Sequence, residues 1–155
     1  MDALDARIVH LFATEPRVGV LEASRRLNVA RGTIQARLDR MQSTGVITGF
    51  GPEIDPAAIG YGVTAFATLE IRQVEGHGTV EDHLAAIPEV LEVHTITGTG
   101  DLLVRIVGRS NDDLQRVIDD VVAIPSIVRT STVIALRNPV PYRTLPLVTA
   151  AARIT

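Results

Sequence analysis

Apolar residues recur at helical spacing over the first part of the chain. Three stripes with intervals of three and four residues are present: Leu4, Ile8, Leu11 and Phe12; Ala23 and Leu27; and Ile34, Leu38 and Met41. Side chains at these intervals share one face of an α-helix, so the pattern predicts three short amphipathic helices. The third helix is expected to span residues 31–44.

Several residues between the stripes fit the ends of these helices. Asp2 is a candidate N-cap for the first helix. Asn28 tolerates the positive φ angle of a tight turn, and Gly45 can adopt the left-handed conformation that ends a helix. Residues 46–54 indicate a short extended wing. Together these features predict a winged helix-turn-helix over residues 1–50.

Basic charge is concentrated in this region. Residues 1–50 hold seven arginines against five acids, whereas residues 51–155 hold eight arginines against thirteen acids. Five of the arginines are expected to lie off the apolar stripes and to project outward: Arg25, Arg26, Arg31, Arg37 and Arg40. A cationic helix face in a helix-turn-helix is typical of binding to double-stranded DNA.

The third helix is expected to divide its DNA contacts between bases and backbone. Because the start of a recognition helix enters the major groove, Arg31, Thr33 and Gln35 are expected to touch base edges. Arg37 and Arg40 are expected to contact phosphates. The predicted DNA-binding set is completed by Arg25 and Arg26.

The second part of the chain contains an internal repeat. Residues 86–91 (AIPEVL) return as residues 123–128 (AIPSIV), each after a helical stripe and before a β-rich run. The repeated unit is strand, helix, proline turn, strand. Its predicted strands are residues 63–71, 91–97, 102–107 and 128–136, and its helical stripes are Val80, Leu84 and Ile87, then Leu114, Val117, Ile118, Val121 and Val122.

Two such units in tandem predict a ferredoxin-like βαββαβ sandwich, which makes the whole chain an α+β protein. Its two helices can cover only one face of the sheet, yet Phe66 and the run 102–107 leave apolar groups on both faces. We therefore expect a second copy of the chain to cover the other face. The expected domains are residues 1–50, a linker over 51–62, a sandwich over 63–138 and a tail over 139–155.

Composition excludes several classes of function. The chain has no cysteine, which removes disulfides, cysteine-ligated zinc and thiol catalysis, and fits a reducing cytoplasm. No apolar run approaches membrane length, and no signal peptide follows Met1. The histidines stand at no zinc or nucleophile spacing, and Gly98-Thr99-Gly100 is not followed by the helix of a phosphate loop. We expect no catalytic residue, metal or cofactor, and hence no enzyme.

The order of these motifs resembles the Lrp/AsnC, or feast/famine, family of transcriptional regulators. The resemblance covers about residues 2–138 and rests on Leu4-Asp5, Glu22-Ala23-Ser24, Arg40-Met41-Gln42, Gly45-Val46-Ile47 and the duplicated sandwich with its hairpin at residues 98–101. It implies a winged helix-turn-helix joined to a RAM- or ACT-like sandwich that senses small molecules and forms dimers, tetramers or octamers. The ligands implied are commonly amino acids, bound near the hairpin at a subunit interface.

The chain departs from the family pattern at three places, one of which is Ala36-Arg37, where the family often has two adjacent arginines. Ala30 stands where the recognition helix usually has a serine N-cap, so that helix is expected to start weakly. At the hairpin the family runs Gly-Asp-x-Asp, whereas this chain keeps only the glycine and the second acid. Asp101 is either a ligand carboxylate or a polar cap on a turn. The candidate effector site is Thr97, Gly98, Thr99, Gly100, Asp101 and Thr132.

The sequence thus predicts a cytoplasmic, homo-oligomeric, sequence-specific DNA-binding transcriptional regulator. Its DNA binding or assembly is expected to respond to a small effector such as an amino acid. The alternative is a metabolite-sensing sandwich whose helical domain docks a protein partner instead of DNA. These two hypotheses differ in salt dependence on duplex DNA, because phosphate contacts release counterions.

Overall fold

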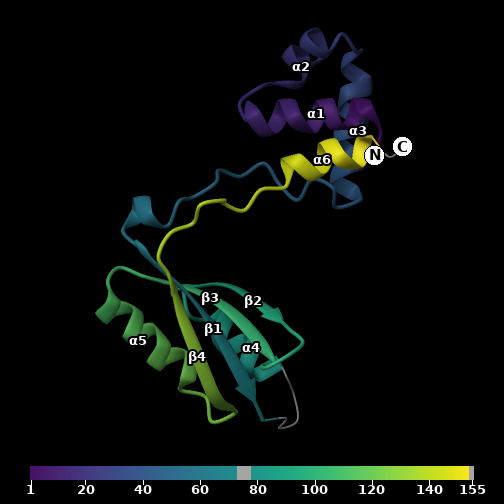
Figure 1. The fold of residues 1–155 in the computed structure, drawn as a ribbon. Coiled ribbons are helices and arrows are strands. Elements are labelled where there is room, and N and C mark those ends of the chain that lie inside the picture. The colour runs from purple at the N-terminus through teal and green to yellow at the C-terminus, as the bar shows by residue number, and fades with distance from the viewer. Residues whose placement is uncertain (73–77, 154–155) are drawn as a thin grey trace. The chain divides into compact units, whose positions relative to one another are not determined.

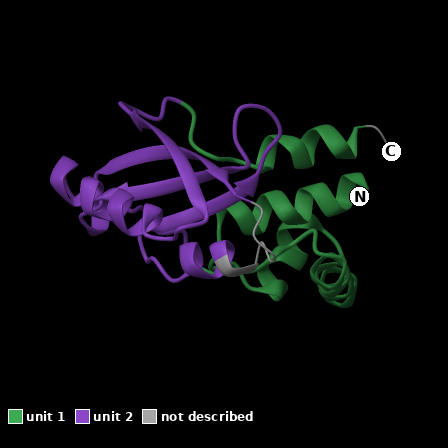
Figure 2. Ribbon diagram, turned by 90° about the horizontal axis from the view of Figure 1, so that it is seen from below, with its two compact units in different colours: residues 1–52, 140–155 green, residues 53–139 purple. Residues whose placement is uncertain are grey.

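The structure, a computed structural model, describes residues 1–72 and 78–153. The chain divides into two compact units, one of residues 1–52 with 140–155 and one of residues 53–139 (Figure 2). Within the described ranges no helix combines the length and apolar character needed to cross a membrane.

The first unit is helical. Its helices are α1 (Ala3–Thr14), α2 (Val20–Leu27), α3 (Arg31–Ser43) and α6 (Leu145–Ala152). Asp2 and Asp5 form a reciprocal capping box at the start of α1, where each carboxylate accepts the other residue's backbone N–H at 2.9 and 3.0 Å. Asn28 has a φ of 53° in the turn before α3, and Gly45 has a φ of 73° after it. The predicted N-cap and both turn residues are therefore confirmed.

The three predicted stripes meet in one small core. Its buried members are Ile8, Ala23, Ile34, Leu38 and Met41. Helix α6, which the sequence analysis did not predict, packs beside α1 (Figure 1). Residues 140–155 thus belong to the helical unit, and the predicted tail contains a helix.

Residues 46–54 leave α3 as an extended segment without strand pairing. The backbone N–H of Ile47 returns to the carbonyl of Met41 at 3.0 Å, and the ring of Phe50 meets that of Phe12 edge-on with centroids 6.0 Å apart. The segment predicted as an extended wing therefore forms no strand, and no described strand lies beside it to pair with. One hydrogen bond and one ring contact hold it against the helices instead.

The second unit is a four-stranded antiparallel sheet with two helices on one face. Its elements are β1 (Val63–Ile71), α4 (Gly78–Ala85), β2 (Val90–Thr95), β3 (Leu102–Gly108), α5 (Asn111–Val122) and β4 (Ile127–Ala135). The strand order β2-β3-β1-β4 confirms the predicted ferredoxin-like topology. A single helical turn (Ala57–Ile59) precedes β1.

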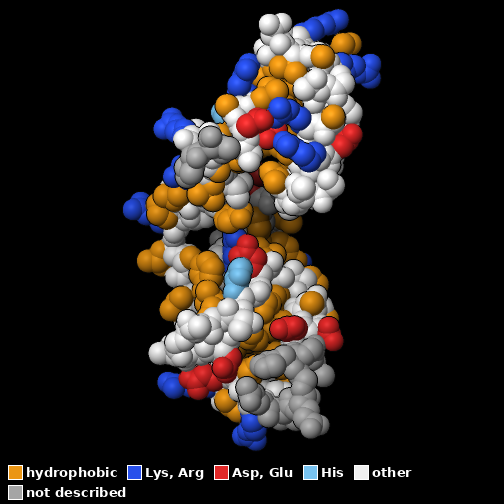
Figure 3. Space-filling view, turned by 90° about the vertical axis from the view of Figure 1, so that its right-hand side faces the viewer, with side chains coloured by type: hydrophobic (Ala, Val, Ile, Leu, Met, Phe, Trp, Pro, Cys, Tyr) orange, Lys and Arg blue, Asp and Glu red, His pale blue; other side chains and the backbone are white. Residues whose placement is uncertain are grey.

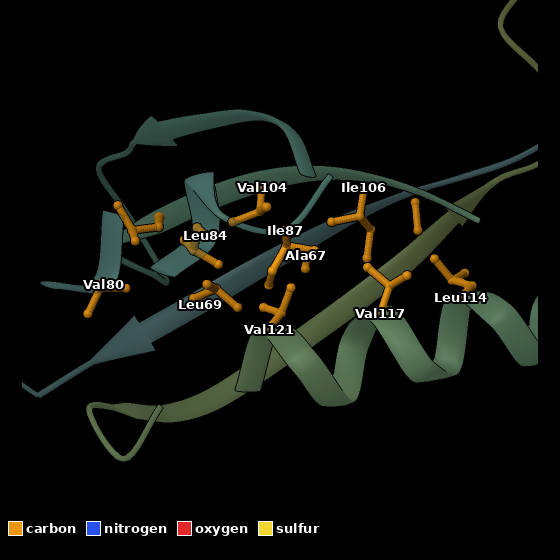
Figure 4. Close-up of a cluster of buried hydrophobic side chains, with 12 residues drawn as sticks. Ala67, Leu69, Val80, Leu84, Ile87, Val104, Ile106, Leu114, Val117 and Val121 are labelled. Atoms are coloured by element: carbon orange, nitrogen blue, oxygen red, sulfur yellow. The ribbon is translucent and has the colours of Figure 1, made fainter. Parts of the chain in front are cut away.

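Alternate residues of the central strands fill the core beneath α4 and α5. Ala67 and Leu69 of β1 and Val104 and Ile106 of β3 point toward helix residues such as Val117 (Figure 4). Their neighbours along each strand lie on the opposite face, which none of the described helices of this unit covers; these include Thr64, Phe66, Thr68, Leu103 and Arg105. That open face mixes apolar and polar side chains.

Candidate nucleic-acid interface and effector site

The N-terminal half of α3 presents an open polar surface. Arg31, Thr33 and Gln35 are all exposed, and the Gln35 amide donates to Asp39 at 2.8 Å. In the part of the chain that the structure describes, the Arg31 guanidinium has no hydrogen-bond or ion-pair partner. Ala30 caps the helix without a side-chain hydrogen bond, as predicted. The start of α3 therefore offers both a cation and backbone N–H groups to solvent.

The arginines of α2 form surface ion pairs. Arg26 lies 2.6 Å from Glu15 and 3.5 Å from Glu22, while Arg25 lies 3.8 Å from Glu22. Their side chains are 43% and 70% exposed, respectively. Exposed pairs of this kind are weak, so both guanidiniums can exchange their partner for a phosphate.

Arg37 and Arg40 are engaged inside the helical unit. Arg37 Nη1 donates to Asp5 Oδ1 at 2.8 Å and also to Asp2, and Arg40 Nη2 donates to Asp5 Oδ2 at 2.7 Å. The Asp5 side chain is only 1% exposed. Figure 3 shows basic side chains directly beside acidic ones on this unit.

The prediction that all five arginines project outward is therefore wrong for Arg37, whose side chain is 27% exposed. Its position explains the difference. Arg37 follows Ile34 by three residues and precedes Met41 by four, so it lies on the same face of α3 as these buried residues. Asp5 likewise precedes the buried Ile8 of α1 by three residues.

Both carboxylates of this cluster are held in the charged form. The hydrogen bond from Arg37, with help from the backbone N–H of Asp5, lowers the pKa of Asp2 from 3.8 to about 2. Burial raises the pKa of Asp5, but the backbone N–H of Asp2 and the two guanidiniums outweigh it, so this pKa is lowered as well. Two carboxylates thus neutralise two guanidiniums.

The predicted effector residues 97–101 lie in one hairpin that is docked on β1. The backbone N–H of Asp101 donates to the carbonyl of Leu69 at 2.9 Å, and its carboxylate Oδ2 accepts the N–H of Ile71 at 2.7 Å. Gly98 has a φ of 116°, and a Cβ on Gly100 would come within 2.3 Å of the Thr68 methyl group. The hairpin therefore depends on both glycines.

Thr132 lies apart from this arrangement. Thr132 belongs to β4 and pairs with Ala67 of β1, so its side chain lies on the helix-covered face of the sheet. The hairpin bonds to the backbone of Leu69 and Ile71, and its Gly100 lies against Thr68 on the other face. One oxygen of Asp101 already accepts the backbone N–H of Ile71 at the end of β1, so it fastens the hairpin to that strand. The contacts of Asp2 and Asp5 with Arg37, and of Thr68 with the hairpin, were not predicted from the sequence, although an acid beside the first apolar stripe was a visible signal for the first cluster.

A helix-turn-helix with an exposed cationic start of α3, followed by a ferredoxin-like sandwich, defines a DNA-binding regulator with a sensor domain. Two family models match the chain in this order. The AsnC-type helix-turn-helix domain matches residues 1–42, and the Lrp/AsnC ligand binding domain matches residues 64–145. The chain belongs to the Lrp/AsnC family of transcriptional regulators.

Two curated relatives are similar over nearly the whole chain. The HTH-type transcriptional regulator FL11 of Pyrococcus horikoshii is 29% identical over 147 residues, covering 95% of this chain and 97% of that protein. The regulatory protein AsnC of Escherichia coli K12 is 30% identical over 141 residues, covering 90% of this chain and 93% of that protein. The chain is thus a DNA-binding transcriptional regulator with a ligand-binding domain, and docking to a protein instead of DNA is not favoured.

Solved structures agree with this fold. The structure of Escherichia coli AsnC matches with a TM-score of 0.86 at 28% identity, covering 94% of this chain and 99% of that one. A transcriptional regulator from Neisseria meningitidis, solved as an L-Met complex, matches with a TM-score of 0.81 at 20% identity, covering 95% and 97%. The second likeness supports the fold alone.

Proposed function

We propose that this regulator reads DNA with the N-terminal half of α3 and that a small molecule, an amino acid in the first instance, modulates its binding or assembly. The observation that carries the first part is the exposed group Arg31, Thr33 and Gln35, in which Arg31 is unpaired within the described residues. We infer a cytoplasmic location from the DNA partner, because the chromosome of bacteria and archaea lies there.

Base readout is assigned to Arg31, Thr33 and Gln35, and phosphate contacts to Arg25 and Arg26. The test begins with a duplex selected by the full-length protein from a randomised library, with a scrambled duplex as reference. Arg31→Ala is expected to change sequence preference at a cost of about 1 to 3 kcal/mol, whereas Arg25→Ala is expected to weaken both duplexes alike. Wild-type protein that binds neither duplex in a salt-dependent way would contradict DNA recognition by this unit.

The hairpin 97–101 is the proposed effector site. Its support is the exposed Asp101, whose Oδ2 bonds to Ile71 and whose Oδ1 is left to accept an ammonium group. The L-Met complex of the Neisseria relative supports the ligand class. Thr99 and Thr132 add hydroxyl groups, although Thr132 lies on the other face and requires a second subunit to join the site.

Thermal-shift screening of free amino acids tests this site. Asp101→Asn is a sharper variant than Asp101→Ala, because the amide oxygen can still accept the N–H of Ile71. We expect the unliganded melting temperature to stay near wild type and the ligand-induced shift to vanish. A shift of equal size in both proteins would mean that the carboxylate only fastens the hairpin to β1 and that the effector binds elsewhere.

We also propose a homodimer, with further assembly to tetramers or octamers, built on the open sheet face. Phe66, Leu103 and the 62%-exposed Val133 lie on this face. A two-fold dimer would present two copies of α3 to half-sites about one helical turn apart. Light scattering should give a multiple of 16.7 kDa, and Phe66→Glu should lower it to one chain. A wild-type monomer at micromolar concentration would remove this proposal.

A further inference from the structure

Four charged side chains form a closed network between two helices of the helical unit. The Asp5 carboxylate, at the start of α1, accepts Arg37 on one oxygen and Arg40 on the other, at 2.8 and 2.7 Å. Arg37 also donates to Asp2, and Asp2 and Asp5 cap each other's backbone N–H groups. The partners are 32 to 35 residues apart in sequence, so the network is a tertiary contact.

This network fixes how α3 is turned about its own axis. Two guanidiniums three residues apart converge on one buried carboxylate, so α3 cannot rotate or slide against α1 without breaking a charged hydrogen bond. Because hydrogen bonds are directional and apolar packing is not, the ion cluster supplies an orientation that the small core does not. The exposed residues Arg31 and Gln35 belong to the same rigid helix.

We propose that Asp5 is a positioning residue for DNA recognition and that Arg37 and Arg40 hold α3 in place instead of contacting phosphates. The proposal rests on the proposed function of α3 as the recognition helix. If Arg37 or Arg40 turned to a phosphate, the carboxylate of Asp5, which is 1% exposed, would lose one of its two charged hydrogen bonds. Uncompensated buried charge is far more costly than an exposed phosphate contact is favourable.

The experiment compares the same substitution at two arginines of the full chain, one assigned to a phosphate and one to the network. The selected and scrambled duplexes are titrated at several salt concentrations with wild type, Arg25→Gln and Arg37→Gln. We expect Arg25→Gln to lower the slope of log affinity against log salt by about 0.9, the value for one phosphate contact, without changing discrimination. Arg37→Gln should leave the slope unchanged and reduce discrimination between the two duplexes about tenfold.

Asp5→Asn supplies the complementary measurement. Removing its charge frees two guanidiniums, so the salt slope should stay the same or rise, while discrimination falls as in Arg37→Gln. A role in stability alone would leave discrimination unchanged at a temperature where circular dichroism shows every variant folded. If Asp5→Asn does not fold, Arg40→Gln replaces it, because Arg40 is 56% exposed and its loss leaves Arg37 on Asp5.

The outcomes separate this proposal from the one it rests on. A salt slope lowered by about one in Arg37→Gln or Arg40→Gln, with discrimination intact, would overturn the positioning role and make these residues phosphate contacts. Full discrimination in Asp5→Asn would overturn it as well. Wild-type protein without salt-dependent DNA binding would instead refute the proposed function.

Discussion

The two units of this regulator are held together by different means. Among the described residues, the sandwich has a core of twelve buried apolar side chains, whereas the helical unit has five and adds an ion cluster around Asp5. A sheet gains its geometry from the register of its strands, which backbone hydrogen bonds fix residue by residue. Packed helices have no such ladder between them. We infer from this contrast that the charged hydrogen bonds to the buried Asp5 orient α3.

The sandwich has an ion cluster too, built around one arginine. Arg116 of α5 contacts Glu89 at 2.6 Å, Asp120 at 2.9 Å and Asp113 at 3.0 Å. Its most buried carboxylate, Glu89, has a side chain that is 10% exposed, against 1% for Asp5. Asp5 receives two guanidiniums from α3, whereas Glu89 shares one guanidinium with two other acids, so the two clusters constrain their helices differently.

Deleting core volume in each unit should produce the largest effects. Ile34→Ala in α3 and Ile106→Ala in β3 each remove a fully buried side chain, at an expected cost of about 2 to 5 kcal/mol. Because the helical core is smaller, Ile34→Ala should unfold that unit while the sandwich stays folded. Amide NMR signals from each unit, followed in urea, measure the two separately. Simultaneous loss of both sets would show that the units unfold as one.

Crowding the hairpin should have the next largest effect. A methyl group on Gly100 would meet Thr68 Cγ2 at 2.3 Å and the Leu69 carbonyl oxygen at 3.2 Å. Gly100→Ala is therefore expected to destabilise the sandwich by about 1 to 3 kcal/mol. Thr68→Ser removes the closer contact, so the double variant should recover much of the loss in urea unfolding. No recovery would mean that the backbone contact at Leu69 dominates.

Local patterns were sufficient to predict most of this fold. The range 63–71 of β1 and the start of β3 at Leu102 agree with alternation in the sequence, and the other two strands agree to within two residues. Asn28 and the Asp2 cap were equally visible, because each depends on the chemistry of one residue and its neighbours. Helix α6 could not be predicted in this way, since its sequence LPLVTAAA has no polar face and Thr144 provides no side-chain cap.

The candidate site was predicted less well than the fold. Exposure of Arg31 and Gln35 follows from helical period, and the structure agrees. The partners of Arg37 do not follow, because Asp5 lies 32 residues away and no local pattern joins the two. The contact of Gly100 with Thr68 is of the same kind. Tertiary contacts between elements decide which charges face inward, and one sequence records them only indirectly.

Acid should weaken the helical unit before the sandwich. A carboxyl whose folded pKa is lowered contributes stability above its unfolded pKa and loses it as pH falls through the folded value. For Asp2 this window runs from about 3.8 down to about 2, and the lowered pKa of Asp5 acts in the same direction. In the described part of the sandwich only Asp113 has a lowered pKa, from the backbone N–H of Arg109 and from Arg116.

Melting curves between pH 5 and 2, with the NMR signals of each unit as the probe, measure this difference. Asp2→Asn is the control, because an amide does not titrate in this range. This variant should lose less melting temperature in the helical unit as the pH falls, and the sandwich should behave as in wild type. Equal acid sensitivity of the two units in wild type would contradict the assignment of the Asp5 cluster as the main acid-labile element.

The smallest effect expected is a gain in stability at α3. Gly32 lies in the first turn of this helix with open space around it, and its φ is not in the left-handed region. Gly32→Ala should stabilise the helical unit by about 0.5 to 1 kcal/mol, because alanine loses less backbone entropy on folding. Gly45 is the matched control, since it has equal space but a φ of 73°. Gly45→Ala should therefore cost about 1 to 2 kcal/mol. Opposite signs in thermal unfolding would trace both effects to backbone conformation, and a gain at both positions would contradict the left-handed turn that ends α3.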